Sequence, residues 1–220
     1  MSSENPIQMM AHYKSSIIQM VPYFMREENK ENSDDYEPNV VSLGPYHHGK
    51  EKLKFLEEYF KPMAVELFIG NSSVGEDDLM VAILGEIRCA KSCYLQEFTS
   101  KYSDEEFARM MLRDACVNLN DIGPTEGHVL YKKFWMIQHL GAVVYANIGR
   151  DMYLLENQVP FQILKTLFFF IYNTHDGDKF VENVENFCFK IFFHDRDIEK
   201  PMTPIIWGGN PFTFLKFFEE

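Results

Sequence analysis

Apolar residues recur at spacings of three and four along most of this 220-residue chain, whereas strict alternation of apolar and polar residues is rare. Spacings of three and four place apolar side chains on one face of an α-helix, and alternation would place them on one face of a strand. The pattern predicts an all-α fold, a globular multi-helix domain of about seven helices with short irregular or extended segments. Because 46% of the residues are hydrophobic, a sizeable core is feasible, and we expect residues 1–220 to form a single helical domain.

Capping residues, glycines and prolines divide the chain into helices. Serine followed three residues later by glutamate has the spacing of a capping box, which predicts helix starts at Ser73 with Glu76 and at Ser103 with Glu106. We expect the first of these helices to extend to about residue 94 and the second to end before Gly123. Further helices are expected in the segment that ends at Val21, at residues 51–68 with a kink or break at Pro62, at residues 129–148 and at residues 179–193.

Three connecting segments can be assigned from composition. Residues 26–39 are polar enough to form a surface loop, and residues 40–43 are expected to be a short extended piece. Residues 151–156 are expected to form a last helical turn or two. The chain then turns at residues 157–159, and Pro160 suits the first position of the next helix, where its missing N–H has no intrahelical acceptor to lose.

The charge balance argues against a nucleic-acid partner. The chain has 33 Asp and Glu residues against 21 Lys and Arg, and clustered basic residues such as Lys50, Lys52 and Lys54 are interleaved with glutamates. A phosphate backbone would therefore meet net repulsion, and we expect no binding of nucleic acid.

The sequence contains no segment typical of a membrane-spanning helix. The longest apolar run, residues 159–172, contains Pro160, Gln162 and Lys165 and falls short of the ~20 apolar residues that a spanning helix needs. The N-terminus has no apolar stretch typical of a secretory signal. We therefore expect this chain alone to be soluble, and the match of Asn71 to the N-glycosylation pattern would matter only in the secretory lumen.

Four cysteines lie in apolar, helix-like stretches, namely Cys89, Cys93, Cys116 and Cys188. This placement predicts free buried thiols instead of a disulfide framework. Cys89 and Cys93 are four residues apart and could share a metal ion, although the same spacing is typical of two side chains that line a core.

Residues 151–161, which read D-M-Y-L-L-E-N-Q-V-P-F, set three polar side chains against an apolar run just before a proline. Glu156, Asn157 and Gln158 could form a polar binding site, because a carboxylate and two amides offer both donors and acceptors. The alternative is structural. A helix end joined to a helix start leaves backbone groups unpaired, and buried amide side chains are well suited to bonding them.

Residues 44–49, which read G-P-Y-H-H-G, place two imidazoles beside a tyrosine. His47 and His48 could hold a metal ion or transfer protons. Adjacent residues of an extended chain point to opposite sides, however, so the two rings lack the one-face geometry of metal ligands. The alternative is a turn in which the glycines take positive φ and the histidines hydrogen-bond the backbone.

Asp114 lies within the apolar residues 110–117, so we expect it to pair with a cation or to cap a neighbouring helix. Catalysis by Asp114 would need a base or metal partner that the sequence does not identify. The short motifs of common hydrolases, phosphate-binding loops, dinucleotide-binding folds and zinc proteases are missing from the chain. We therefore expect no catalytic residue, no cofactor and no metal, and a protein that binds instead of turning over a substrate.

Three blocks of sequence resemble the plant family called domain of unknown function 247. Residues 36–49 read Y-E-P-N-V-V-S-L-G-P-Y-H-H-G, and the family block is Y-x-P-x-x-V-S-I-G-P-Y-H-H-G. Residues 106–116 are similar to E-F-x-x-M-M-L-x-D-G-C with Ala115 in place of the usual glycine, and residues 151–161 contain L-L-E-N-Q-x-P-F. The motif residues, which we expect to be structural, are Tyr36, Pro38, Gly44, Pro45, Tyr46, His47, His48, Gly49, Phe107, Met111, Asp114, Cys116, Asp151, Leu154, Leu155, Glu156, Asn157, Gln158, Pro160 and Phe161.

The resemblance implies a longer protein, with a further helical region and a membrane-spanning helix near its C-terminus. We expect both to be absent from this chain, so that contact with the plasma membrane or another membrane would need that helix. In some grasses, members of the family are implicated in self-incompatibility between pollen and stigma.

Three functional hypotheses follow from the residues and the resemblance. The first is a non-enzymatic recognition or signalling component that binds a protein partner and is membrane-associated when full length. The second is a soluble intracellular protein–protein interaction module. The third is an unrecognised hydrolase or metalloenzyme centred on His47, His48 and Asp114. The resemblance favours the first hypothesis, by analogy.

Overall fold

The computed structural model describes residues 18–28, 35–70, 72–122, 128–172 and 183–184. None of these residues is in a β-strand, and their helices confirm the all-α prediction. The elements are α2 (Tyr23–Glu28), η2 (Glu51–Leu53), η3 (Leu56–Phe60), α3 (Lys61–Ile69), α4 (Glu76–Gly85), α5 (Ile87–Ser92), α6 (Gln96–Thr99), α7 (Asp104–Ile122), α8 (His128–Leu140), α9 (Ala142–Asp151) and α10 (Phe161–Tyr172). In the described part of the chain, no helix has the length and apolar character needed to cross a bilayer.

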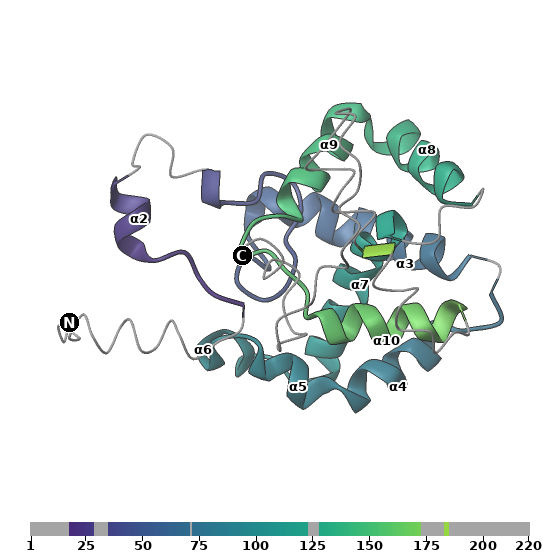
Figure 1. The fold of residues 1–220 in the computed structure, drawn as a ribbon, viewed down its shortest axis with the longest axis horizontal. Helices are drawn as coiled ribbons and strands as arrows, with labels where there is room; N and C mark the ends of the chain where they lie inside the picture. Colours follow the sequence, from purple (N-terminus) through teal and green to yellow (C-terminus); the bar gives the residue numbers. More distant parts are fainter. Residues whose placement is uncertain (1–17, 29–34, 71, 123–127, 173–182, 185–220) are drawn as a thin grey trace, which may run out of the picture.

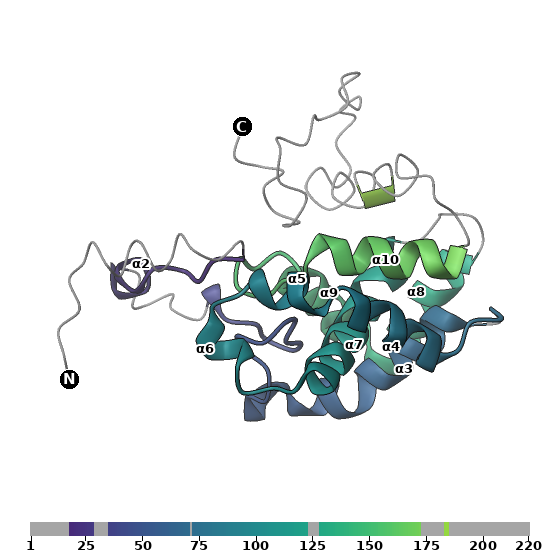
Figure 2. The same ribbon diagram turned by 90° about the horizontal axis from the view of Figure 1, so that it is seen from below.

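Helix α7 lies at the centre of the fold. It contacts α3, α4, α8 and α10. In Figure 2, α10 lies along one side of α7 and α3 along the other, while Figure 1 shows α8 and α9 at one end of the molecule. The inward side chains of α7, such as Phe107, Met111 and Leu119, are fully buried. Because α7 satisfies its own backbone hydrogen bonds, these side chains are free to pack.

The expected helix at residues 51–68 is present and continues through Pro62, with right-handed helical backbone angles at Phe60 and Lys61. A 3₁₀ turn at Glu51–Leu53 is followed by the π-helical turn η3, and α3 then begins at Lys61. A proline has no N–H to give to the preceding turn, and a wider turn is a common local accommodation. The chain is therefore helical through Pro62, where the sequence predicts a kink or break, and the irregularity is the wider π turn before the proline.

Two of the expected helices are each interrupted once. The helix expected from Ser73 to residue 94 consists of α4 and α5, which meet at Glu86. The helix expected at residues 129–148 consists of α8 and α9, which meet at Gly141 with a φ of 84°. A positive φ is not compatible with a right-handed helix, so the chain changes direction at Gly141.

One of the two predicted capping boxes is confirmed and the other is wrong. At the start of α7, the Ser103 N–H donates to Glu106 Oε2 at 2.9 Å, and the Glu106 N–H donates to Ser103 Oγ at 3.1 Å. At the start of α4, the Gly75 N–H instead donates to Asp78 Oδ2 at 3.0 Å. Half of a capping box therefore operates two residues later than the Ser73 and Glu76 pattern indicated, because glycine has no side chain to accept the reciprocal bond.

The N-terminal expectation also needs correction. Residues 18–22 are not helical, and helix α2 begins at Tyr23, inside the region partly assigned to a polar loop. The Ile18 N–H bonds to the Cys93 carbonyl at 2.9 Å, so this segment is held by another part of the chain. Predictions for residues 1–17, for Asn71 and Cys188, and for residues 179–193 apart from 183–184 lie outside the described residues.

Residues 36–49, which we call the signature segment, pass through the middle of the fold without forming a helix. Residues 40–43 are non-helical, in agreement with the sequence, but they pair with no strand. Val41 and Leu43 are fully buried, and most of their neighbours in the segment are buried as well. Buried backbone groups need partners, and in this segment neither helix nor sheet supplies them.

Candidate functional site

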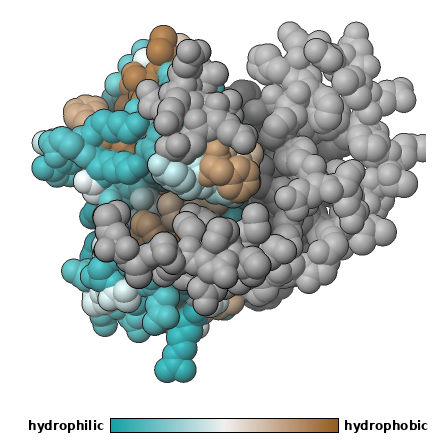
Figure 3. All heavy atoms as spheres, turned by 90° about the vertical axis from the view of Figure 1, so that its left-hand side faces the viewer, coloured by the Kyte–Doolittle hydropathy of each residue, from teal (hydrophilic) through white to brown (hydrophobic). Residues whose placement is uncertain are grey.

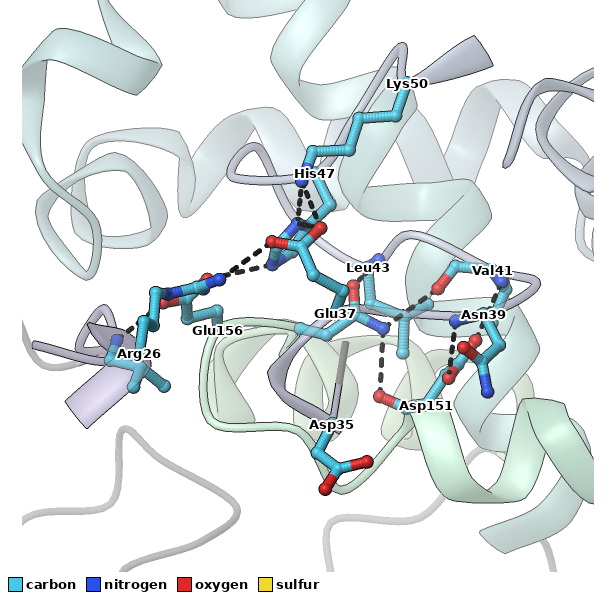
Figure 4. Close-up of polar contacts among 12 residues, drawn as sticks. Arg26, Asp35, Glu37, Asn39, Val41, Leu43, His47, Lys50, Asp151 and Glu156 are labelled. Atoms are coloured by element: carbon cyan, nitrogen blue, oxygen red, sulfur yellow. Dashed lines mark hydrogen bonds and ion pairs between the residues drawn. The ribbon is translucent and has the colours of Figure 1, made fainter. Parts of the chain in front are cut away.

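Asp151, the last residue of α9, bonds three consecutive backbone groups of the signature segment. Its carboxylate accepts hydrogen bonds from the N–H groups of Asn39, Val40 and Val41 at 2.9, 2.7 and 3.1 Å. The Arg150 guanidinium donates to the same carboxylate at 2.9 Å and to the Glu37 carbonyl at 3.0 Å. Figure 4 shows Asp151 facing this part of the segment. Asp151 therefore takes the place that a neighbouring strand would have in a sheet.

Asn157 continues this pattern along the segment. Its side-chain oxygen accepts from the Leu43 N–H at 2.6 Å, and its side-chain nitrogen donates to the carbonyls of Val41 and Asp151, each at 2.9 Å. One amide thus bonds a helix end and two positions of the signature segment. Asn157 is fully buried, so water cannot substitute for these contacts.

Asp114 on α7 bonds the next backbone group. Its Oδ2 accepts from the Gly44 N–H at 2.7 Å, and its Oδ1 lies 2.6 Å from Lys61 Nζ. The pairing with a cation that the sequence predicted is therefore present, and both side chains are buried. Burial raises the pKa of Asp114, although Lys61 and the Gly44 N–H act in the opposite direction.

Gly44 is required by both its conformation and its surroundings. Its φ is +76°, and a Cβ at this position would lie 2.8 Å from the Gln158 carbonyl oxygen and 2.8 Å from Tyr94 Oη. The Tyr94 hydroxyl donates to that carbonyl at 2.7 Å. The segment thus passes so close to the turn after Asn157 that a side chain has no room.

Glu57 holds the far end of the signature segment. It accepts from the Ser42 hydroxyl and, at 3.2 Å, from the Gly49 N–H, and it lies 3.4 Å from His48 Nδ1. Burial alone would raise the pKa of Glu57, but His48, Lys61 and Ser42 outweigh it and lower the pKa to about 2. Glu57 is therefore a carboxylate at neutral pH.

Glu156 connects the segment to the N-terminal arm, residues 18–28. It accepts from the Val21 N–H at 2.5 Å and lies 2.7 Å from the Arg26 guanidinium and 3.0 Å from His47 Nε2. Burial would raise the pKa of Glu156, but His47, Arg26 and the Val21 N–H hold it below its ordinary value. Figure 4 shows Arg26 between Glu156 and Glu37.

Tyr46 anchors the same arm from another direction. Its hydroxyl donates to the Ile18 carbonyl at 2.8 Å and accepts from the Leu95 N–H at 3.1 Å. Its ring meets the rings of Tyr94 and Phe98 edge to face, with centroids 5.5 and 4.8 Å apart. The tyrosine of the G-P-Y-H-H-G block thus joins three parts of the chain.

The two histidines face different groups, as expected for neighbours in an extended chain. His47 lies against Glu156 and also within 2.8 Å of Lys50 Nζ, whereas His48 lies against Glu57 and the ring of Tyr102. In the described part of the chain, no three histidines, cysteines or carboxylates are grouped as a metal site would require. The expectation that the histidines bond backbone needs correction, since both rings lie against side chains. The positive φ of Gly44 and of Gly49 is confirmed.

The remaining motif residues have mostly buried positions. The Arg26 guanidinium lies over the Tyr36 ring, with its central carbon 5.9 Å from the ring centroid. Leu155 is 54% exposed, and Leu154 is partly buried. Fully or nearly fully buried are Pro38, Pro45, Phe107, Met111, Cys116, Gln158, Pro160 and Phe161. Helix α10 begins directly after Pro160, close to the predicted start.

The predicted burial of the thiols is confirmed for two of the three cysteines that the structure describes, and Cys89 is only partly buried. Cys89, Cys93 and Cys116 are free, and the last two are buried. Burial raises the pKa of Cys93 to about 12 and raises the pKa of Cys116 as well, so neither thiol is a nucleophile at neutral pH.

Sequence reasoning did not single out several residues that complete this network. Glu57 and Lys61 are examples, although a pattern marks them. Each directly follows a core position of the expected helix, Leu56 or Phe60, and they are four residues apart. Charged residues at that spacing next to a core face indicate buried partners. Arg26, Arg150 and Tyr94 carry no comparable signal.

A family model described as plant protein of unknown function, domain of unknown function 247, matches residues 18–205. The chain belongs to this family. All three signature blocks lie within the matched residues, which confirms the resemblance drawn from sequence.

One curated relative of this family member is the UPF0481 protein At3g47200 of Arabidopsis thaliana. It is 29% identical over 146 residues, which cover 62% of this chain and 28% of the relative. The match thus spans less than a third of the relative's length. No solved structure matches the chain.

Proposed function

We propose that this chain is a non-enzymatic recognition or signalling component that acts by binding a protein partner. The proposal rests on the structural role of the polar residues in the family pattern. Asp114, Asp151, Glu156 and Asn157 all bond backbone groups, within or next to the signature segment. A family pattern that maintains a core supports a scaffold, whose surface can then vary with the partner.

A second candidate, a hydrolase or metalloenzyme, draws support from one pocket. A cavity of about 350 Å³ is lined by groups that include His48, Glu57, Lys61 and Asp114. Each of these three charged groups has a partner in the core, since Glu57 bonds Ser42 and Gly49, and Lys61 pairs with Asp114. His47 contacts Glu156 and Glu37 instead of lining this cavity. The geometry therefore favours binding over catalysis.

The surface offers apolar side chains for such a partner. Figure 3 shows hydrophobic patches set among hydrophilic residues on one face of the molecule. Among the residues that the structure describes, the large hydrophobic ones with more than half of their surface exposed are Tyr23, Phe24, Phe55, Tyr59, Val81, Tyr131, Phe134, Val143 and Leu155. Exposed aromatic residues are frequent at protein interfaces.

The test is cross-linking of the tagged chain in tissue that expresses it, followed by reconstitution from purified proteins. We expect a stoichiometric protein partner whose binding persists in His48→Gln, because that change removes the pocket imidazole without removing a backbone partner. The matched assay incubates the purified chain with a metabolite extract. Turnover of a metabolite by the wild type that disappears in His48→Gln would contradict the proposal and favour an enzyme.

A further inference from the structure

A groove of about 530 Å³ lies between the region around η3 and the junction of α8 with α9. Its volume is typical of sites that take a few side chains of a ligand. The apolar part of its lining comes from separate elements that meet there. These residues include Val40, Phe55, Leu56, Tyr59, Leu140 and Val144.

Part of the lining of this groove belongs to the signature segment. Asn39 and Val40 line it, and the backbone N–H groups of both are held by the Asp151 carboxylate. The Asn39 side chain also donates to Asn147 Oδ1 at 3.1 Å. The polar network that secures the core therefore also fixes the position of the groove.

Two aromatic residues form one edge of the groove. Phe55 and Tyr59 are 67% and 60% exposed, and their ring centroids are 5.3 Å apart. They are four residues apart, so they lie on one face of the turn. On the other side, the His139 ring stacks on Trp135 with centroids 3.9 Å apart. Aromatic side chains have few rotatable bonds, so they lose little conformational entropy when a partner binds.

The charge of the groove differs from that of the chain. Two basic residues, Lys52 and His139, line the groove, and no aspartate or glutamate lines it. The chain as a whole has a formal net charge of −12. The nearby Glu58 lies 3.9 Å from Lys54, which offsets its charge. An acidic ligand would therefore meet less repulsion in this groove than over the average surface.

We propose that this groove binds an acidic amphipathic helix of the protein partner, with apolar side chains inserted between Tyr59 and Val144 and a carboxylate near Lys52. The inference rests on the proposed function, since it assigns a surface and a chemistry to the partner. The described residues contain no strand edge to which a peptide could add, and a groove between helices suits a helix.

The experiment uses two fluorescein-labelled peptides and fluorescence anisotropy with the whole chain. Both peptides have leucine and phenylalanine at helical spacings of three and four, and the flanking positions are glutamate in one and lysine in the other. We expect the glutamate peptide to bind more tightly. Phe55→Ala and Tyr59→Ala should each weaken it at least about tenfold, as for central aromatic residues of an interface.

Matched variants separate the groove from general effects. Phe24→Ala removes an exposed aromatic residue of α2, on another side of the molecule, and should leave binding unchanged. Lys52→Glu should weaken the glutamate peptide, whereas Lys101→Glu changes the net charge equally and should not. The variants replace exposed residues, so an unchanged melting temperature should confirm that each is folded.

Three outcomes would overturn the proposal. The first is that neither peptide binds, and the second is that both peptides bind equally well. The third is that binding of the glutamate peptide survives Phe55→Ala and Tyr59→Ala. Dimerisation of the chain that is lost in Phe55→Ala would instead assign the groove to a second copy of this chain. If a cross-linked partner is found and still binds Tyr59→Ala, the groove is wrong while the proposed function stands.

Discussion

Helix α7 and the signature segment are both buried at the centre of the fold, but they are held there in different ways. In α7 the backbone is bonded internally, and side chains such as Phe107 and Met111 pack against neighbouring helices. In the signature segment, the backbone is bonded by Asp151, Asn157 and Asp114 from elsewhere in the chain.

This difference explains why the family pattern contains buried acids and amides. A helix can accept many apolar substitutions of similar volume, because its backbone bonds do not involve side chains. An irregular buried segment depends on particular side-chain atoms, and losing one leaves a backbone group without a partner. Polar residues can thus mark a fold without taking part in chemistry.

The largest effect is expected for Asp151→Ala. The change removes the acceptor of three backbone N–H groups and a partner of Arg150, so the free energy of unfolding should fall by at least about 4 kcal/mol. Asp104→Ala on α7 is the control. Its ion pair with Lys91 is at the surface, so the loss should be about 0–1 kcal/mol. If urea unfolding gave similar losses of unfolding free energy for Asp151→Ala and Asp104→Ala, the contrast between the signature segment and α7 would be contradicted.

A smaller effect is expected for Gly44→Ala. The new Cβ would lie 2.8 Å from the Gln158 carbonyl oxygen in a left-handed conformation, and we expect a loss of about 2–4 kcal/mol. At Gly49 the φ is also positive, but an added Cβ would have no atom within 4 Å. Gly49→Ala should therefore lower the free energy of unfolding by about 1–2 kcal/mol through backbone strain alone. Equal changes in denaturation midpoint would show that the close approach is unimportant.

Asn157→Ala should lower the free energy of unfolding by about 1–3 kcal/mol, because the Leu43 N–H loses its acceptor and two carbonyls lose a donor. Asn147→Ala removes an amide whose two hydrogen bonds, with the Asn39 side chain and the Val143 carbonyl, lie at the surface where water can replace them, and it should cost about 0.5 kcal/mol. Thermal unfolding of the two variants provides the test. An unchanged melting temperature for Asn157→Ala would refute the structural account.

The smallest effect is expected from pH. Glu37 and Glu57 have pKa values lowered from 4.5 to about 2, in each case because cationic partners outweigh burial. Their contribution to stability is therefore present above about pH 4.5 and is lost as the pH falls towards 2. Glu57→Gln should flatten this part of the stability profile, whereas Glu66→Gln at an exposed site of α3 should follow the wild type.

Local signals predicted much of the fold. The helical spacing predicted the all-α class, and Ser103 with Glu106 predicted the start of α7. Each of these depends on residues within a few positions of one another. The failure at Ser73 had the same origin, since the Asp78 carboxylate accepts from the Gly75 N–H two residues later and provides a local alternative.

The candidate site was predicted less well because its contacts are distant in sequence. Asp151 and Asn157 were identified as unusual residues, but nothing in the sequence indicates that they bond residues 39–43. The carboxylate partner of His47 could not be predicted for the same reason. Two helices also proved to be interrupted at Glu86 and Gly141, where apolar spacing continues across the break.

The distance between the signature segment and its partners has a consequence for biosynthesis. Leu43 and Asn157 are 114 residues apart, so the segment leaves the ribosome long before the residues that bond it. At about 5–20 residues per second, the delay is on the order of 10 seconds. During that time the segment's amides must remain hydrated, and residues 36–49 take their native position only when the turn after α9 has been made.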